Sequence, residues 1–258
     1  MATKTAIVTG ASSGIGEWIA RLLAERGYDL FVVARRADRL EKLREELEGK
    51  HRVKVTPLTL DLSDPAAPEK LFEQTEGAGV DVDVLINNAG FGTQGHFPEI
   101  SWEKSSEQMR LNVFSLTELT WRFLTPMKKR NHGYILNVAS IGAYMPVPGY
   151  ATYAAGKAFV RNFSEAVAHE LRHTNVRVCC LCPGPTATEF IDVAGQKVSA
   201  AEKLAFMSAE RCARIGVSAL LGGRRLIISG WLMSLSMWWL RFLPRRVITM
   251  IAAAFMEK

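Results

Sequence analysis

The 258-residue sequence lacks the signatures of several protein classes. It has only four cysteines, and three of them fall within Cys179–Cys182 on one short apolar strand, where thiols buried in the core are favoured over a zinc or redox site. Its five histidines share no ligand-like spacing, so we predict no metal site. The first apolar run, Thr5–Val8, leads straight into a Thr-Gly pair, which argues against a signal peptide. We therefore expect buried, reduced thiols in a reducing cytosol.

An excess of charge of one sign is also missing from most of the chain. The net charge is +6, yet the first 221 residues carry 26 basic and 25 acidic side chains. From Gly222 onward, six basic residues are accompanied by a single acid, so the basic character lies in the tail. A nearly neutral body disfavours binding to nucleic acid, and we predict no such partner.

Short β-branched runs alternate with helical patterns along the chain. The runs are continuously apolar, as is typical of a parallel sheet covered on both faces. Residues 1–230 are thus predicted to form one α/β domain, a doubly wound, seven-stranded parallel sheet of Rossmann type with helices on both faces. We expect helices over Gly16–Arg26, Arg39–Glu48, Pro68–Thr75, Glu107–Lys129 and Tyr153–His173. The predicted strands are Thr5–Thr9, Leu30–Ala34, Val53–Leu58, Val84–Asn87, Tyr134–Val138, Val176–Leu181 and Arg225–Ile228.

Two segments depart from this alternation. Residues 184–210 contain no predicted strand, and we interpret them as a helical flap over a substrate site. Residues 231–258 form a predicted helical extension, and the uncharged run Leu226–Leu240 covers 15 residues, fewer than the roughly 20 of a membrane span. Two interpretations of 231–256 stay open: packing against the body or a second subunit, and peripheral contact with a membrane. The apolar flap residues favour a hydrophobic substrate, although they could instead pack on the body: Phe190, Ile191, Val193, Val198, Leu204, Phe206 and Met207.

A glycine-rich turn follows the first predicted strand and opens a helix. Its spacing is G-x-x-x-G-x-G, from Gly10 to Gly16. Glycines permit close approach of the backbone to a pyrophosphate, and the helix N-terminus supplies free N–H groups. The second strand ends at Arg35 and Arg36, with no acid before Asp38. A basic pair here accommodates the 2′-phosphate of NADP, whereas an acid would bind the ribose of NAD, so NADP(H) is the predicted cofactor; the alternative is a solvated charged turn.

A possible acid–base pair lies further along the chain. Tyr153 and Lys157 have i, i+4 spacing, which places both on one helix face. The lysine charge, aided by an oxidised nicotinamide, is expected to lower the tyrosine pKa from about 10 toward neutrality. Ser140, thirteen residues upstream of Tyr153, could hold a substrate oxygen and stabilise charge on it. Taken alone, the pair could also be an exposed amphipathic feature.

These motifs, in order with Asn88–Gly90 and Pro183-Gly184, resemble the short-chain dehydrogenase/reductase family from residue 4 to about residue 190. The resemblance implies hydride transfer between a nicotinamide and a carbonyl carbon, with Tyr153 as general acid/base. It also implies that Lys157 binds the nicotinamide ribose and that Asn112 helps to hold a proton-relay water. The predicted catalytic residues are Ser140, Tyr153, Lys157 and Asn112. The predicted cofactor-binding residues are Gly10, Ser12, Ser13, Gly14, Ile15, Gly16, Arg35, Arg36, Asp61, Leu62, Asn88, Ala89, Gly90, Tyr153, Lys157, Pro183, Gly184, Thr186 and Thr188.

The sequence therefore predicts an NADP(H)-dependent oxidoreductase acting on a small apolar carbonyl or secondary alcohol. Reduction is the expected direction, because cytosolic NADP pools are mostly reduced. Family members are often dimers or tetramers, so we expect a cytoplasmic homo-oligomer, with the membrane-peripheral alternative for the tail left open. A second hypothesis is a catalytically silent NADP(H)-binding redox sensor or membrane-docking protein. The presence of Ser140, Tyr153 and Lys157 argues against it, since a silent protein has no need of them.

Overall fold

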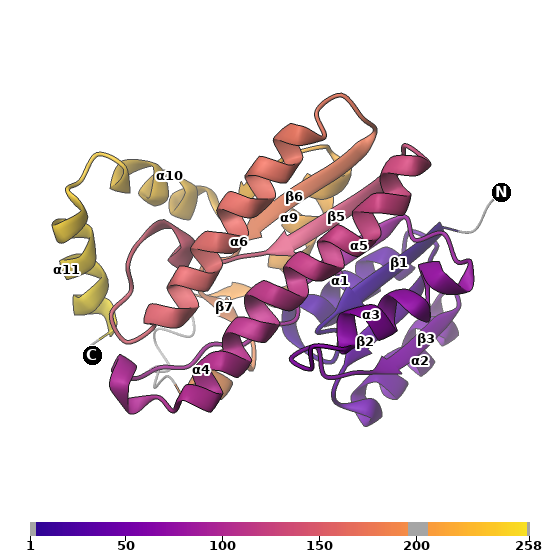
Figure 1. The fold of residues 1–258 in the computed structure, drawn as a ribbon, viewed down its shortest axis with the longest axis horizontal. Helices are drawn as coiled ribbons and strands as arrows, with labels where there is room; N and C mark the ends of the chain where they lie inside the picture. Colours follow the sequence, from indigo (N-terminus) through magenta and orange to yellow (C-terminus); the bar gives the residue numbers. More distant parts are fainter. Residues whose placement is uncertain (1–3, 196–205, 257–258) are drawn as a thin grey trace.

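The computed structural model describes residues 4–195 and 206–256. Its core is a seven-stranded parallel sheet of order β3-β2-β1-β4-β5-β6-β9, which confirms the predicted doubly wound α/β fold (Figure 1). The strands are β1 (Lys4–Thr9), β2 (Tyr28–Ala34), β3 (Val55–Thr59), β4 (Val84–Asn87), β5 (Gly133–Val138), β6 (Val176–Cys182) and β9 (Leu226–Ile228).

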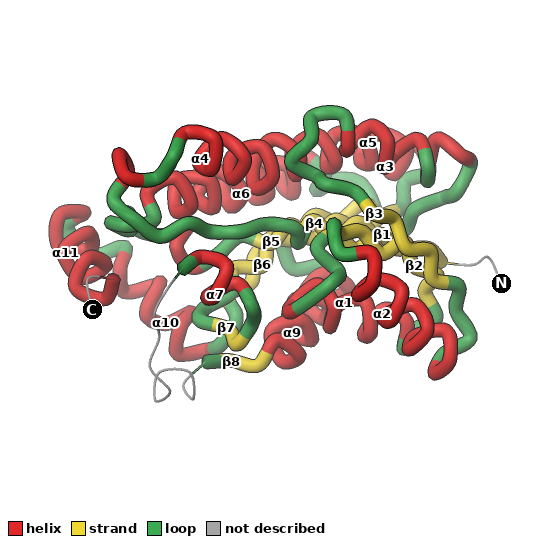
Figure 2. The backbone as a smooth tube through the Cα atoms, turned by 90° about the horizontal axis from the view of Figure 1, so that it is seen from below, coloured by secondary structure: helices red, strands yellow, loops and turns green. Residues whose placement is uncertain are grey.

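Helices cover both faces of the sheet because its central strands are apolar on both sides. In β1, Ala6 and Val8 belong to one hydrophobic core, while Ile7 between them belongs to the other. Figure 2 shows α1, α2 and α9 on one face and α3, α5 and α6 on the opposite face. The elements on the two faces are α1 (Gly14–Ala24), α2 (Ala37–Lys50), α3 (Ala67–Glu73), α4 (Trp102–Met109), α5 (Leu116–Lys129), α6 (Ala151–Glu170) and α9 (Ala209–Leu221), with 3-10 turns η1 (Glu76–Ala78), η2 (Phe97–Glu99) and η4 (Ile141–Tyr144).

The predicted helix Glu107–Lys129 differs from the observed one in its start and its regularity. The helix begins at Trp102, where the Ser101 hydroxyl accepts a hydrogen bond from the Lys104 amide at 3.3 Å. A π-helical segment, η3 (Arg110–Ser115), then separates α4 from α5. Single π-turns of this kind are frequent at functional sites, and apolar periodicity does not reveal them.

The prediction that residues 184–210 contain no strand is wrong. β7 (Thr186–Ala187) pairs in parallel with β8 (Met207–Ser208), and α7 (Phe190–Ala194) follows β7. Strands of two residues are too short to produce a period that can be recognised in sequence. The flap is thus held at both ends by a small ladder, and α9, which the sequence patterns did not predict, continues directly from β8.

The tail forms two helices at one end of the molecule, α10 (Trp231–Leu240) and α11 (Arg245–Met256) (Figure 1). Met237 of α10 and Ile248 and Ala252 of α11 are buried, so one side of each helix packs inward. Within the described residues, no helix combines the length and apolarity needed to cross a membrane. The four cysteines are free and buried in the body, as predicted.

Candidate active site

A cavity of about 1510 Å³ opens where the strand order reverses, at the carboxyl ends of β1 and β4. In doubly wound sheets this switch point is the usual ligand site, because the loops leaving the two strands diverge. All of the predicted site residues line the cavity except Gly16 and Asn112. The topology thus brings together segments that lie far apart in the sequence.

The glycine-rich turn has the conformation that its spacing predicts. Gly10 and Gly14 adopt φ values of 66° and 58°, which side chains disfavour. Gly16 lies behind the turn, where a Cβ atom would stand 2.4 Å from both the Asn88 Nδ2 and the Gly10 oxygen. Asn88 Nδ2 in turn donates to the Thr9 carbonyl at 3.0 Å. Because Gly16 has no side chain, the turn can lie against the end of β4. Gly16 itself does not line the cavity.

The two arginines after β2 have different surroundings. Arg36 Nη2 donates to the Ser12 and Ser13 hydroxyls at 3.0 and 2.8 Å, which fixes its guanidinium beside the glycine-rich turn. Arg35 is more exposed, and its Nη1 lies 3.7 Å from an Asp61 carboxylate oxygen and 3.4 Å from a Glu107 one. The predicted basic pair is therefore unequal, with Arg36 the better positioned of the two for an anionic group at the turn.

Glu189 of the flap, which sequence reasoning missed, lies beside this arginine. Its carboxylate pairs with Arg36 Nη1 at 2.8 Å and also with Arg39 on α2. Hydrogen bonds from Arg36 and Arg39 lower the pKa of Glu189 to about 2, so it is ionised at neutral pH. The flap is consequently tied by ion pairs to the end of the cavity that holds Arg36.

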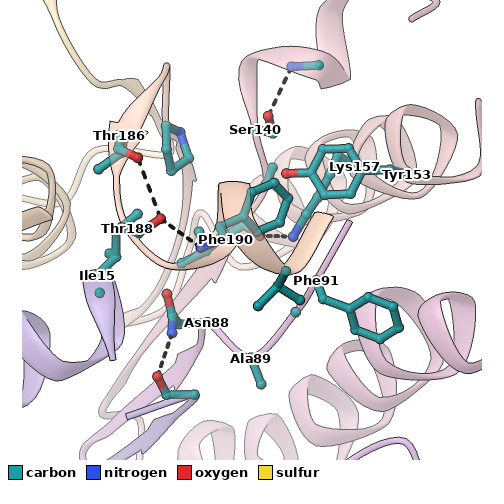
Figure 3. A pocket seen from close by; sticks show the side chains of 18 of the residues that line it. Ile15, Asn88, Ala89, Phe91, Ser140, Tyr153, Lys157, Thr186, Thr188 and Phe190 are labelled. Atoms are coloured by element: carbon teal, nitrogen blue, oxygen red, sulfur yellow. Dashed lines mark hydrogen bonds between the residues drawn. The ribbon is translucent and has the colours of Figure 1, made fainter. Parts of the chain in front are cut away.

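Ser140, Tyr153 and Lys157 converge on the cavity from two elements (Figure 3). Ser140 caps η4, where its hydroxyl accepts from the Gly142 amide at 3.1 Å. Tyr153 and Lys157 lie one turn apart on α6, with Nζ 5.7 Å from the centre of the tyrosine ring. Lys157 is only 4% exposed and donates to the Val138 carbonyl at 2.8 Å, which orients it along the end of β5.

Burial controls the protonation of this group. It raises the pKa of Tyr153 to about 12, although a hydrogen bond with Ser140 acts to lower it. It lowers the pKa of Lys157 to about 8, because the charged form is desolvated. The sequence predicts a tyrosine pKa that is lowered toward neutrality, but the protein's own groups raise the pKa of Tyr153. At neutral pH Tyr153 carries its proton.

Asn112 lies behind the cavity wall. It belongs to the π-helical segment η3, and its side chain makes two hydrogen bonds with the Phe91 backbone, accepting at 3.2 Å and donating at 2.8 Å. A Cβ atom on Gly90 would stand 2.8 Å from Asn112 Oδ1 and 3.5 Å from Lys157 Nζ. The glycine at this position therefore lets Asn112 and Lys157 approach the strand end closely.

The other end of the cavity is apolar. Phe190 of the flap packs against the Tyr153 ring with centroids 5.4 Å apart, and a Cβ atom on Gly92 would come within 2.7 Å of Phe190 Cζ. Of the remaining flap predictions, Val193 and Phe206 line the cavity, whereas Met207 packs on the body; Val198 and Leu204 fall outside the described residues, as does the side chain of Ile191. Lining residues that sequence reasoning missed come from loops after β4 and β5 and from the tail: Phe91, Gln94, Met145, Val147, Tyr150, Met233, Ser236, Met237, Leu240, Ile251 and Ala252.

Comparison with known proteins establishes the family. Residues 4–198 match the family model described as short chain dehydrogenase, and the chain belongs to this family. It is 34% identical to a 3-ketodihydrosphingosine reductase of Bacteroides thetaiotaomicron, over 74% of this chain and 67% of that protein. A short-chain dehydrogenase from Sphingobium yanoikuyae, solved with NADPH, has a TM-score of 0.85 at 29% identity and covers 93% of this chain and 92% of its own.

Related structures differ in their nicotinamide cofactor. A short-chain dehydrogenase/reductase from Burkholderia phymatum, solved with NAD, shares the fold at a TM-score of 0.81 and 23% identity, covering 92% of each chain. Family membership makes this short-chain dehydrogenase an oxidoreductase of carbonyl and alcohol groups. Structures that share this fold have thus been solved with NADPH and with NAD.

Proposed function

We propose that this oxidoreductase is an NADP(H)-dependent reductase of apolar ketones, with Tyr153 as the proton donor. The observation that carries the proposal is the placement of Ser140, Tyr153 and Lys157 together in the middle of a cavity that holds Arg36 at one end. A silent NADP(H)-binding protein would have no need for a buried lysine charge one helical turn from a protonated tyrosine. The catalytic hypothesis is therefore favoured over the silent one.

The residues that line the cavity fit a nicotinamide dinucleotide phosphate. The turn at Gly10–Gly14 leaves backbone N–H groups at the start of α1 free for a pyrophosphate. Arg36, held by Ser12 and Ser13, would bind the 2′-phosphate, for which planar guanidinium donors are well suited. Lys157 would hold the nicotinamide ribose in the middle of the cavity. When bound, the reduced cofactor supplies the hydride for the carbonyl carbon.

Proton delivery follows from the geometry around Tyr153. Its raised pKa keeps the phenol protonated at neutral pH, which suits reduction, because a ketone needs a proton as its oxygen becomes negative. The Ser140 hydroxyl would donate to the same oxygen and stabilise that charge. The Lys157 charge would stabilise the phenolate left behind. We assign Asn112 a positioning role, because its side chain is committed to the Phe91 backbone.

An apolar substrate is favoured by the lining of the catalytic end. Phe190, Val193 and Phe206 of the flap contribute to it, together with Met237 and Leu240 of α10. A relative at 34% identity is named for reduction of the ketone of a sphingoid base, which is a substrate of this class. Recognition at this end would therefore depend mainly on apolar contact.

We further propose a cytoplasmic homo-oligomer formed across α5 and α6. Exposed aromatic side chains gather on these helices and on the adjoining η3 segment, namely Phe114, Trp121 and Phe159. Large exposed aromatics of this kind are typical of the centres of protein interfaces. A cytoplasmic location fits the four buried, unbridged thiols. Light scattering checks the assembly: wild type should have at least the dimer mass, and Trp121→Glu should have a lower one.

The proposed activity is tested by following NADPH absorbance with a panel of apolar ketones. Wild type should reduce at least one member, and Tyr153→Phe should lose at least about a thousandfold in turnover while its NADPH affinity, measured by fluorescence titration, stays within a few-fold. Tyr144→Phe is the matched control, because the buried Tyr144 hydroxyl has no partner within the described residues. Turnover by Tyr153→Phe close to that of wild type would overturn the assignment.

A further inference from the structure

The outer side of the tail exposes an unusual concentration of large apolar side chains. We call this side the tail surface; its members are Trp231, Leu232, Leu235, Trp238, Trp239, Phe242, Leu243, Val247 and Met250. Trp231 and Met250 are each 71% exposed, and Trp238, Trp239 and Phe242 form one edge-to-face aromatic cluster. Scattered apolar side chains are ordinary on protein surfaces, but a group gathered on two adjoining short helices marks an interaction site.

The charged side chains of the segment that carries the tail surface are all positive. From Arg211 to Met256 the sequence contains seven arginines and no Asp, Glu or Lys. Three of them, Arg241, Arg245 and Arg246, lie at the junction of α10 and α11, and none forms an ion pair with another described residue. A two-fold contact between copies of the tail would bring these arginines together, because symmetric contacts pair a surface with itself. An anionic surface is the better complement.

A phospholipid bilayer with anionic headgroups matches both properties. Tryptophan and arginine are favoured at the boundary between headgroups and acyl chains, and short apolar helices lie in that plane without crossing the membrane. α10 has 10 residues and α11 has 12, which suits this arrangement. In Figures 1 and 2 the two helices stand at one extremity of the molecule, where a flat surface could reach them.

The inner sides of the same helices form a wall of the cavity. Met233, Met237 and Leu240 of α10 and Ile251 and Ala252 of α11 line it. Outward and inward residues are neighbours in sequence: Met237 and Leu240 face the cavity, while Trp238 and Trp239 between them are exposed. One layer of helix therefore separates the proposed membrane surface from the apolar end of the cavity.

We infer that the tail surface docks on an anionic phospholipid bilayer and that the enzyme takes its substrate, a long-chain lipid ketone, directly from that bilayer past α10 and α11. The substrate half of this inference rests on the proposed function, whereas docking does not. An apolar ketone dissolved in the membrane would then reach Tyr153 without passing through water.

Docking is tested by sedimentation of the full chain with phosphatidylcholine vesicles, with and without phosphatidylglycerol, at low salt. Wild type should bind only the anionic vesicles. Arg245→Gln/Arg246→Gln should weaken binding about thirty-fold, since each basic residue near an anionic surface contributes about 1 kcal/mol. Lys128→Gln/Lys129→Gln, a matched pair of exposed charges on α5, should bind as wild type does. Equal binding to both vesicle types, or none, overturns docking.

Insertion is tested by the quenching of tryptophan emission with brominated lipids in the same vesicles. Trp239→Ser should lose part of the quenching, whereas Trp102→Ser on α4, which is at least as exposed, should retain it. If Trp239→Ser instead lowers the particle mass in light scattering and leaves the quenching unchanged, the tail surface is a contact between copies and the inference fails.

Delivery is tested with two ketones: undecyl methyl ketone dissolved in the anionic vesicles, and cyclohexanone in water. Arg245→Gln/Arg246→Gln should lose most turnover of the vesicle-borne ketone and keep that of cyclohexanone. Wild type that reduces only cyclohexanone overturns delivery. Turnover of neither ketone counts against the proposed function and delivery together, while sedimentation still decides docking.

Discussion

The two ends of the cavity are built from different kinds of structure. The end that holds Arg36 is formed by the turns that leave β1 to β4, and every strand there is hydrogen-bonded on at least one side within the sheet. The catalytic trio stands at the middle, on η4 and α6. The far end is formed by the flap and by α10 and α11, which lie outside the main sheet. The sheet thus fixes the positions of the lining residues at one end of the cavity, and the packing of short helices fixes them at the other.

This difference separates chemistry from selectivity. Groups that must meet a common cofactor are held by strand ends, whose spacing the sheet determines. Groups that meet the substrate are carried by segments that can differ between relatives without disturbing the sheet. The family match reaches residue 198 and so stops short of α10 and α11. Substitutions at the two ends of the cavity should therefore have different effects on cofactor preference and on substrate turnover.

After Tyr153→Phe, the largest effect is expected from a hydroxyl in the middle of the cavity. Ser140→Ala should reduce turnover about a hundredfold or more, because removing one donor to a developing oxyanion typically costs that much. The NADPH affinity should remain within a few-fold of wild type. Ser236→Ala is the control, since this hydroxyl also lines the cavity but donates to the Leu232 carbonyl of its own helix at 3.0 Å. Steady-state kinetics with a ketone substrate would show the difference, and equal losses in both variants would contradict the proposed role.

A second effect concerns stability at the catalytic trio. The folded-state pKa of Lys157 is lowered to about 8 from 10.5, so the unfolded chain binds more protons between these values. Burying the charge therefore destabilises the fold below pH 8, and this cost disappears as the pH rises to 10.5. Lys157→Met should raise the free energy of unfolding at neutral pH by up to about 3 kcal/mol.

Urea unfolding across this pH range measures the prediction. The advantage of Lys157→Met should shrink as the pH approaches 10.5, whereas Lys128→Met, at an exposed position on α5, should change stability little at any pH. An advantage that stays constant with pH would show that packing, and not the buried charge, explains the gain.

The third effect is expected at the cofactor end of the cavity, where two adjacent arginines can be compared. Arg36→Ser should lower the preference for NADPH over NADH by about ten- to a hundredfold, the value of charge-assisted hydrogen bonds to a phosphate. Arg35→Ser should have a smaller effect, because Arg35 lies near Asp61 and Glu107. Ratios of kcat/KM for the two cofactors decide between them, and a larger loss in Arg35→Ser would reverse the assignment.

The sequence predicted the sheet and the cofactor end well because both depend on local patterns. Seven apolar runs produced seven parallel strands, and the glycine spacing predicted the turn at Gly10. The sequence did not distinguish Arg35 from Arg36. The Arg35 partner, Glu107, is distant in sequence, and the Arg36 partner, Ser12, lies in a turn whose side-chain contacts no sequence pattern reveals. The sequence also could not predict which tail residues line the cavity. Met237 and Trp238 are both apolar, and only tertiary packing decides which of them faces inward.

The smallest predicted effect concerns the contact that joins the two ends. Glu189 belongs to the flap, yet its carboxylate pairs with the Arg36 guanidinium that would receive the 2′-phosphate. A phosphate must displace this carboxylate, so Glu189→Gln should tighten NADPH binding. The pair is partly exposed, and such pairs are worth at most about 1 kcal/mol, which limits the gain to roughly fivefold.

The same substitution should not affect NADH, which carries no 2′-phosphate. Fluorescence titration of both cofactors checks this, with Glu107→Gln, the partner of Arg35, as the matched control. If Glu189→Gln weakens NADPH instead, the carboxylate holds Arg36 in its binding position and does not compete with the phosphate. If Glu189→Gln raises the affinity for both cofactors equally, the gain comes from release of the flap. The two ends of the cavity would then be coupled through motion of α7 and not through charge.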